Sequence, residues 1–476
     1  MSKLLLLVAA VPVAAAVLAV FVRWERTERE HWVVFLLLGL LVTESSVYEN
    51  QTFVPRGFFH PGSGSFQFRL PEVIIALALM AHLLVQGRPR RIGAPALFWV
   101  TVAAWWTLEM VEGLLRHNST VKLPYEAKAV IYVMGAYALA SAVPVRRFLD
   151  GPGLQRLMRG SALAAAVLLV LTAAGKKTFA VPIPALRLSN FGSLGTDAAT
   201  IFVSIGVIGF LLELAKEHRS RLNLLCVVPL MFSAFFAYQR AVLLTLAACV
   251  IVIVAVSMGS TARRRLRVRV GEVAVAALAV LGILVGVSVV PAITSNSSVT
   301  GPLTTTLHKT IGYTIGSQAK AQSAQSRLNK WSVAYGYAKE DPFLGKGLGF
   351  EYRYFTPGPN QFVMTDLTEN IGLDLWLRTG LIGLALFLLA LLTSLANGFA
   401  AWRLHPDRMV AVFALALFTV VIGLVAKGQV ESIFENYRLA TMLGLSLGML
   451  RSAVTSGGGS PTTMRTFDAV RQYEVV

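Results

Sequence analysis

The hydrophobic positions of this chain come in long, nearly unbroken runs that short polar segments separate. Many of the runs are about 17–25 residues long, the length that an α-helix needs to cross about 30 Å of hydrocarbon. We therefore predict an all-α polytopic membrane protein with about 13 membrane-spanning helices, in a range of roughly 12–14. The predicted spans are residues 4–22, 32–45, 69–86, 94–110, 127–144, 161–174, 197–215, 223–238, 241–258, 272–291, 371–396, 409–426 and 438–451.

The composition agrees with a membrane protein. Of the 476 residues, 55% are hydrophobic and only 14% are charged, which is unusual for a soluble protein. The first apolar run ends at Arg23 without a small-residue cleavage site, so we interpret it as a membrane helix and not as a signal peptide. Cys226 and Cys249 both lie inside apolar runs, and we expect reduced core residues there, neither a disulfide nor a metal pair.

The net charge of +18 raises the possibility of nucleic-acid binding. The basic residues instead cluster after predicted spans 1, 3, 5, 7, 9 and 11, as the positive-inside rule expects of cytoplasmic loops. We therefore predict no nucleic-acid partner, an outer N-terminus, and contact of the run Arg263–Arg269 with anionic lipid headgroups. The clusters are Arg23–Arg29, Arg88–Arg91, Arg146–Arg159, Lys216–Arg221, Arg263–Arg269 and Arg403–Arg408.

The same alternation predicts how the chain is organised. Residues 1–291 hold predicted spans 1 to 10, residues 292–370 form one large loop on the outer side, residues 371–451 hold the last three spans, and residues 452–476 form a flexible cytoplasmic tail. Loops of this length are usually functional.

Within the large loop, the spacing of side chains predicts a helix over residues 318–339 that ends at Asp341-Pro342. Its predicted amphipathic face consists of Arg327, Trp331, Tyr335 and Ala338. The glycine-rich residues 343–349 do not lie between a strand and a helix, so they indicate a turn and not a nucleotide-binding loop.

Two charged residues are candidates for chemistry at the outer side. Glu369 lies where the large loop enters the next membrane helix; loss of hydration would favour its action as a base, whereas a nearby arginine would oppose it. Arg240 lies between two apolar runs, against the inside bias of basic residues. It can snorkel to lipid phosphate, or it can converge with Arg327 on an anionic ligand such as a lipid diphosphate.

Three segments resemble the bacterial O-antigen ligase and Wzy-type O-antigen polymerase superfamily. The first comprises Ser326-Arg327 with Trp331, the turn at residues 342–349, and Glu369-Asn370 followed after nine residues by Gly380-Leu381-Ile382-Gly383. The second is Tyr238-Gln239-Arg240-Ala241-Val242-Leu243. The third and weakest is Arg187-Leu188-Ser189-Asn190-Phe191-Gly192.

The resemblance implies a fold similar to the C-type glycosyltransferases and a transferase of the bacterial cytoplasmic membrane. A glycan on a polyprenyl diphosphate is moved to an acceptor hydroxyl of a glycan or glycolipid at the outer face. No metal or other cofactor is implied, and the seven histidines show no pair at ligand spacing. By this likeness the donor diphosphate binds Arg240, Arg327 and Arg187, Glu369 is catalytic, and the supporting residues are Trp331, Asn370, Tyr238 and Gln239.

Glu369 departs from the family pattern, because ligases carry a histidine at its position. A glutamate can also accept a proton, and the exchange slightly favours a polysaccharide polymerase or another branch of the superfamily. The alternative function is a transporter or flippase of a lipid-linked saccharide, but such proteins carry ionisable residues near the middle of their spans. Plainer interpretations also stay open: Arg327 and Trp331 as interface anchors, Glu369 as a partner of the helix dipole, and Lys427 with Glu431 as an ordinary i, i+4 pair.

Overall fold

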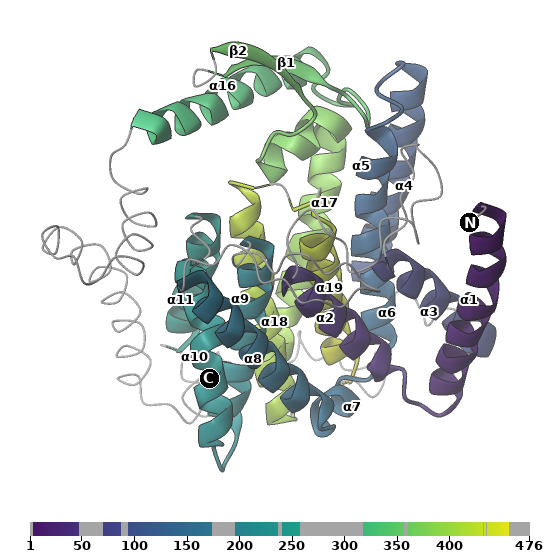
Figure 1. Ribbon diagram of the computed structural model, residues 1–476, viewed down its shortest axis with the longest axis vertical. Coiled ribbons are helices and arrows are strands. Elements are labelled where there is room, and N and C mark those ends of the chain that lie inside the picture. Colours follow the sequence, from purple (N-terminus) through teal and green to yellow (C-terminus); the bar gives the residue numbers. More distant parts are fainter. Residues whose placement is uncertain are drawn as a thin grey trace, which may run out of the picture.

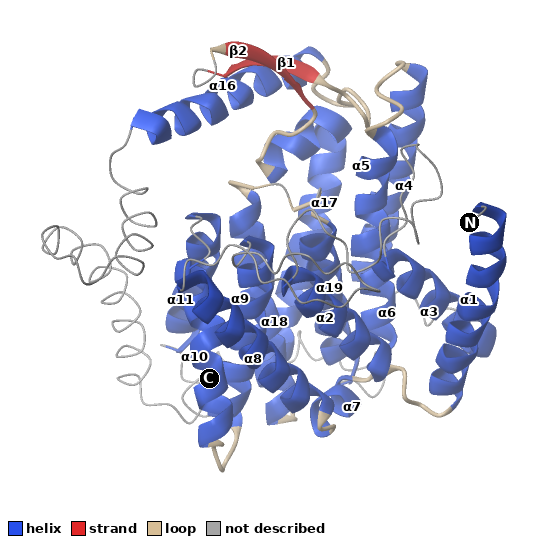
Figure 2. Ribbon diagram, in the orientation of Figure 1, coloured by secondary structure: helices blue, strands red, loops and turns tan. Residues whose placement is uncertain are grey.

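The computed structural model describes residues 3–46, 70–86, 94–173, 196–236, 240–257, 318–356, 360–431, 433–434 and 436–456. These residues are mostly helical, with one short β-hairpin (Figure 2). The helices before the large loop are α1 (Lys3–Arg26), α2 (His31–Ser46), α3 (Leu70–Gln86), α4 (Ala94–Leu115), α5 (Leu123–Val130), the π-helical turn η1 (Ile131–Gly135), α6 (Ala136–Ala142), α7 (Val145–Asp150), α8 (Gly153–Ala173), α9 (Thr196–Ala215), α10 (Arg221–Phe236) and α11 (Arg240–Ser257). After them come α16 (Gln318–Glu340), β1 (Tyr352–Thr356), β2 (Gln361–Thr365), α17 (Ile371–Leu404), α18 (Arg408–Gly428) and α19 (Tyr437–Ser456).

The predicted spans coincide with helices wherever the structure describes them. The span 127–144 is divided between α5, η1 and α6, and the span 272–291 lies outside the described residues. Among the described residues, four helices are long and apolar enough to cross a membrane by themselves: Gly153–Val170, Asp197–Ala215, Ile371–Leu404 and Arg408–Gly428. The chain is therefore an all-α membrane protein apart from its hairpin, while the total of about 13 spans stays a prediction.

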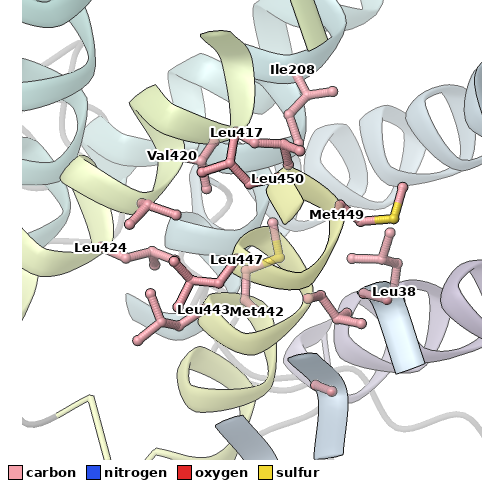
Figure 3. Packing of buried hydrophobic residues seen from close by; sticks show 14 of the residues in the cluster. Leu38, Ile208, Leu417, Val420, Leu424, Met442, Leu443, Leu447, Met449 and Leu450 are labelled. Carbon is pink, nitrogen blue, oxygen red and sulfur yellow. The ribbon is translucent and has the colours of Figure 1, made fainter. Parts of the chain in front are cut away.

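The centre of the fold is built from helices that are apolar on every side. Most residues of α18 and α19 are buried, and nearly all of α9 is, as expected for helices surrounded by other helices. Figure 3 shows leucines of α18 and α19 in one cluster with Leu38 of α2 and Ile208 of α9. This packed interior gives the surrounding helices a fixed frame.

Glycines allow α19 to approach η1 and α6 closely. Gly444 and Gly448 are four residues apart, and a Cβ atom on either one would meet the backbone oxygen of Val133 or Tyr137. Small residues at this spacing are typical of helix pairs in membranes, where close backbone contact replaces the hydrophobic effect as the source of attraction.

The described basic clusters lie together at one end of the helices. Arg146 pairs with Asp407 at 3.0 Å, Arg147 pairs with Glu28 and, at 3.3 Å, with Glu30, and Arg159 donates to Asn223 at 3.1 Å. These contacts join the α1–α2, α6–α8, α9–α10 and α17–α18 connections, whose shared end we call the basic end. Figure 1 shows α16 and the hairpin at the opposite end, which we call the loop end. The clusters at residues 88–91 and 263–269 lie outside the described residues.

The loop end is covered by α16 and the antiparallel pair β1–β2, in which Tyr352 lies opposite Thr365. The helix ends at Glu340, directly before Asp341-Pro342 as predicted. Of the predicted face, Ala338 is buried, whereas Tyr335 is 45% exposed. Among residues 325–340 of α16, Lys330, Ala334 and Ala338 are buried, and the two alanines pack against Tyr352 of β1 and Leu377 of α17.

Residues 343–349 form the predicted turn, which fits between α4 and α17. Gly347 has φ +76° and lies against the backbone of Gly113, where a Cβ atom would be 2.8 Å from the Gly113 nitrogen. On the other side, α17 kinks at Gly380, which has φ +64° and lies against the backbone of Phe343. Only glycine satisfies both the positive φ and the close approach at these two positions.

Candidate functional site

Glu369 joins α16 to the start of α17 at the loop end. Its Oε2 lies 2.8 Å from Arg327 Nε, and its Oε1 lies 2.8 Å from Lys330 Nζ. Arg327 and Lys330 are three residues apart, so they project from neighbouring positions on one side of α16. The structure therefore brings two of the predicted site residues together, with both carboxylate oxygens paired to a cation.

Lys330 and Arg327 differ in their access to solvent. The Lys330 side chain is 7% exposed, and its ammonium group also lies over the Tyr354 ring, 5.3 Å from the centroid. The Arg327 side chain is 46% exposed. The buried lysine is thus a fixed partner of Glu369, whereas the guanidinium group of Arg327 can reach a ligand at the surface.

The backbone of Glu369 has φ +58°, a left-handed conformation that residues other than glycine rarely adopt. Hydrogen bonds fix it from both sides. The Trp331 indole Nε1 donates to the Thr368 oxygen at 2.7 Å, and the Asn370 side chain accepts from Leu373 N at 2.9 Å as the N-cap of α17. Trp331 and Asn370 therefore position Glu369 through its two neighbours, and they do so at an energetic cost that is typical of functional sites.

Asn370 also connects Glu369 to the turn between α18 and α19, because its Nδ2 donates to the Gln429 oxygen at 3.1 Å. Below this contact the start of α17 is held by a buried ionic network. Arg378 pairs with Asp374 at 3.0 Å and with Glu126 of α5, and Glu126 accepts from Gly349 N at 2.6 Å. Glu126, which has no predicted role, thus links α5, α17 and the glycine turn.

A second cluster of charges borders the site. Lys427 is fully buried at the end of α18, with its ammonium 3.0 Å from Glu431 and 3.5 Å from Asp197. The i, i+4 pair of Lys427 and Glu431 is therefore present, and Asp197 at the start of α9 extends it. Burial raises the pKa of Glu431, while the charges of Lys427 and Arg327 act in the opposite direction. This cluster adjoins the Glu369 site, because Asn370, which follows Glu369, donates to the oxygen of Gln429, which lies between Lys427 and Glu431 in the chain.

Arg240 is the first residue of α11, and its side chain lies outside the description. The helix runs antiparallel to α18: Cys249 donates to the Thr419 oxygen at 3.6 Å, and Thr245 packs against Gly423. One turn further along both helices, the start of α11 is level with Lys427. Convergence of Arg240 with Arg327 stays a prediction, and Arg187, Tyr238 and Gln239 lie outside the described residues.

A comparison with known families finds one similar family. Residues 224–388 match the family model described as O-antigen ligase. Over these residues the chain is similar to the O-antigen ligase family. The match includes Arg240, Arg327, Trp331, Glu369 and Asn370, and it confirms the resemblance to the superfamily of membrane glycan ligases and polymerases. A search of curated proteins finds no match.

The matched segment begins in α10 and ends within α17, so it contains the whole Arg327–Glu369–Lys330 group. The second charge cluster adds Asp197 before the segment and Lys427 and Glu431 after it. The site at the loop end is therefore completed by helices on both sides of the matched segment. Within the described residues, no group of three or more His, Cys, Asp or Glu side chains could hold a metal ion.

Sequence reasoning about the matched segment missed Lys330 and the hairpin. Lys330 stands in a polar stretch, and nothing in its neighbours indicates that it is buried. The hairpin had a weak signal, because Tyr352, Arg353 and Tyr354 alternate between aromatic and charged residues, as strand residues with one buried face do. Tyr354 borders the candidate site, since its ring contacts the ammonium of Lys330.

Proposed function

We propose that this protein transfers a glycan from a polyprenyl diphosphate to an acceptor hydroxyl at the outer face of the cytoplasmic membrane. The observation that carries the proposal is the half-exposed Arg327 guanidinium beside the Glu369 carboxylate, inside the segment that is similar to the O-antigen ligase family. Guanidinium suits a diphosphate because its charge is permanent and its N–H donors match two phosphate oxygens at once. A carboxylate next to that position suits proton transfer from a hydroxyl group.

The distribution of charge supports the outer face. Arg146, Arg147 and the other described basic clusters meet at the basic end. Glu369 pairs with Arg327 of α16, and α16 lies at the loop end (Figure 1). Basic loops are retained on the cytoplasmic side of membranes. The candidate site then faces the opposite side, where glycans assembled on a lipid carrier are joined to their acceptors.

In the proposed reaction, Arg327, together with Arg240 and Arg187, holds the donor diphosphate. The oxygen of the acceptor hydroxyl attacks the anomeric carbon, and the bond between that carbon and the diphosphate oxygen breaks. The polyprenyl diphosphate leaves with the electron pair, and the hydroxyl proton passes to the Glu369 carboxylate. Arginine groups fixed at the leaving diphosphate stabilise the charge that develops on it.

Among the reactions of this superfamily we favour polymerisation, in which the acceptor is a second lipid-linked glycan. The reason is the glutamate at position 369, where ligases carry a histidine. A glycan repeat joined to another repeat gives products of many lengths, whereas ligation attaches a finished chain once.

The experiment is deletion of the chromosomal gene, followed by complementation with wild type, Arg327→Ala or Arg353→Ala. Arg353 is an exposed arginine of β1 and serves as the matched control. We expect long surface polysaccharide with wild type and Arg353→Ala, and single repeats with the deletion and Arg327→Ala. Normal polysaccharide in the strain with Arg327→Ala would refute the proposed role of the site. Accumulation of full-length lipid-linked chains would assign the protein to ligation.

A further inference from the structure

Arg327 already has an ionic partner, although the proposed function requires it to bind a diphosphate. We infer that the donor diphosphate replaces Glu369 as the partner of Arg327, and that Lys330 then keeps Glu369 in place. This inference rests on the proposed function. The exchange makes Glu369 available to an acceptor only when a donor is bound. The donor therefore binds before the acceptor.

The two cations are suited to different parts of this exchange. Arg327 reaches Glu369 through one nitrogen, Nε, at 2.8 Å, and its side chain is half exposed. A guanidinium group has five N–H donors, so it can engage an incoming anion before it releases the carboxylate. Lys330 is enclosed between α16, the Tyr354 ring and Glu369, and it has no comparable access to a ligand.

The balance of charge explains why the second cation is needed. Without ligand, one carboxylate is shared by two cations, which leaves a net positive charge for an anion. After the exchange, the diphosphate is paired with Arg327 and Glu369 with Lys330. Without Lys330, the Glu369 carboxylate would be an unpaired anion beside the diphosphate, and the two would repel each other.

The backbone at Glu369 limits the exchange to side-chain movement. The Trp331–Thr368 hydrogen bond and the Asn370 contacts with Leu373 and Gln429 hold both neighbours of Glu369 in place. The start of α17 therefore cannot follow Arg327 toward a ligand. Glu369 stays at the entrance of the membrane helix, within reach of the acceptor.

The exchange predicts an unusual effect of a conservative substitution. In Glu369→Gln the competing carboxylate is lost, so Arg327 is free for the diphosphate. Partly exposed ion pairs contribute little, and we expect the dissociation constant for a diphosphate to fall by about two- to fivefold. In Lys330→Met, Glu369 depends on Arg327 alone, and binding weakens by a similar factor.

The test is a titration of the purified full-length protein with geranylgeranyl diphosphate, a short polyprenyl diphosphate, and in parallel with inorganic pyrophosphate. The variants are Glu369→Gln, Lys330→Met, the double variant, Arg327→Ala, and Lys339→Met as an exposed lysine control on α16. Lys330→Arg, which keeps the charge, distinguishes loss of the ion pair from poor folding. We expect the double variant to bind as tightly as Glu369→Gln, because Lys330 matters only while Glu369 competes.

The outcomes separate this inference from the proposed function. If Arg327→Ala weakens binding of the lipid probe but Glu369→Gln does not strengthen it, the exchange is wrong and the proposed function stands. If Arg327→Ala binds both probes like wild type, the diphosphate role of Arg327 is wrong and the exchange fails with it. Pyrophosphate should rank the variants as the lipid probe does, since the exchange concerns the headgroup; a reversed ranking would contradict it.

Discussion

The indole nitrogen of Trp331 lies 2.7 Å from the backbone oxygen of Thr368, to which it donates a hydrogen bond. Thr368 directly precedes Glu369, which has a positive φ. The hydrogen bond to Thr368 helps to hold the backbone of Glu369 in that conformation. A tryptophan of α16 therefore sets the position of a carboxylate on another segment. This contact explains why an arginine and a tryptophan four residues apart belong to one site.

Trp331→Phe removes this hydrogen bond and keeps the aromatic ring. We expect a loss of about 1 kcal/mol of folding free energy, the usual contribution of one hydrogen bond, and a larger effect on kcat than on donor binding. Trp376→Phe is the matched control. Trp376 also donates an indole hydrogen bond, of 3.1 Å, but to the backbone oxygen of Pro342 and not to a neighbour of Glu369. Thermal unfolding and the transfer rate of both variants check the prediction, and equal loss of activity in the two would contradict it.

Substitutions of Glu369 distinguish a base from a structural anion. Glu369→Gln keeps the shape but cannot accept a proton, so we expect transfer to slow by at least about 100-fold. Glu369→His can accept a proton while neutral and should retain more activity than Glu369→Gln. Its activity should fall at low pH, where the imidazole is protonated and is repelled by Arg327 and Lys330. Equal activity of the two variants across the pH range would show that position 369 does not transfer the proton.

The raised pKa of Glu431 predicts that the free energy of unfolding changes with pH. Burial raises its pKa above the usual value of 4.5 in the folded state. A carboxyl group with a raised pKa in the fold contributes stability that is complete below its unfolded pKa and is lost as pH rises through the folded pKa. Wild type should therefore lose part of its thermal stability as pH rises above about 4.5, and Glu431→Gln should lack this component. Glu340→Gln on the exposed side of α16 is the control and should follow wild type.

The contact between α19 and α6 predicts that small-to-large changes are severe. A leucine at Gly448 would press against the backbone oxygen of Tyr137, and we expect a loss of at least about 2–3 kcal/mol from overpacking. Gly160→Ala is the control, because nothing lies within 4 Å of a Cβ atom there. That change should be neutral or stabilising, since alanine favours a helix over glycine. Thermal unfolding in detergent compares the two, and similar melting temperatures would contradict the close packing of α19.

Much of the fold could be predicted from the sequence, for a clear physical reason. Apolar runs such as residues 409–426 must be helices in a bilayer, because only a helix satisfies the backbone within one segment. The break at Asp341-Pro342 was equally visible, since proline cannot continue the helix. The buried face of α16 could not be predicted, because the burial of Lys330 and Ala334 depends on β1 and α17, which are distant in the chain.

The candidate site was predictable only in part. The likeness to the O-antigen ligases indicated Arg327, Trp331, Glu369 and Asn370, and the structure brings these four together. Lys330 could not be found, because a single lysine in a polar helix gives no sign of a partner 39 positions away. The contact of Asp197 with Lys427 likewise arises from two helix ends, of α9 and α18, that meet only in the folded protein.

The central claim is that Arg327 binds the diphosphate of a lipid-linked glycan during transfer. Purified protein in lipid nanodiscs, supplied with a polyprenyl-diphosphate-linked glycan from the same organism, tests it most directly through release of polyprenyl diphosphate. The account predicts that wild type and Arg353→Ala release it at similar rates as longer glycans form, and that Arg327→Ala is slower by about 100-fold or more, as for loss of a fixed charge donor. Release by Arg327→Ala at the wild-type rate would contradict the claim.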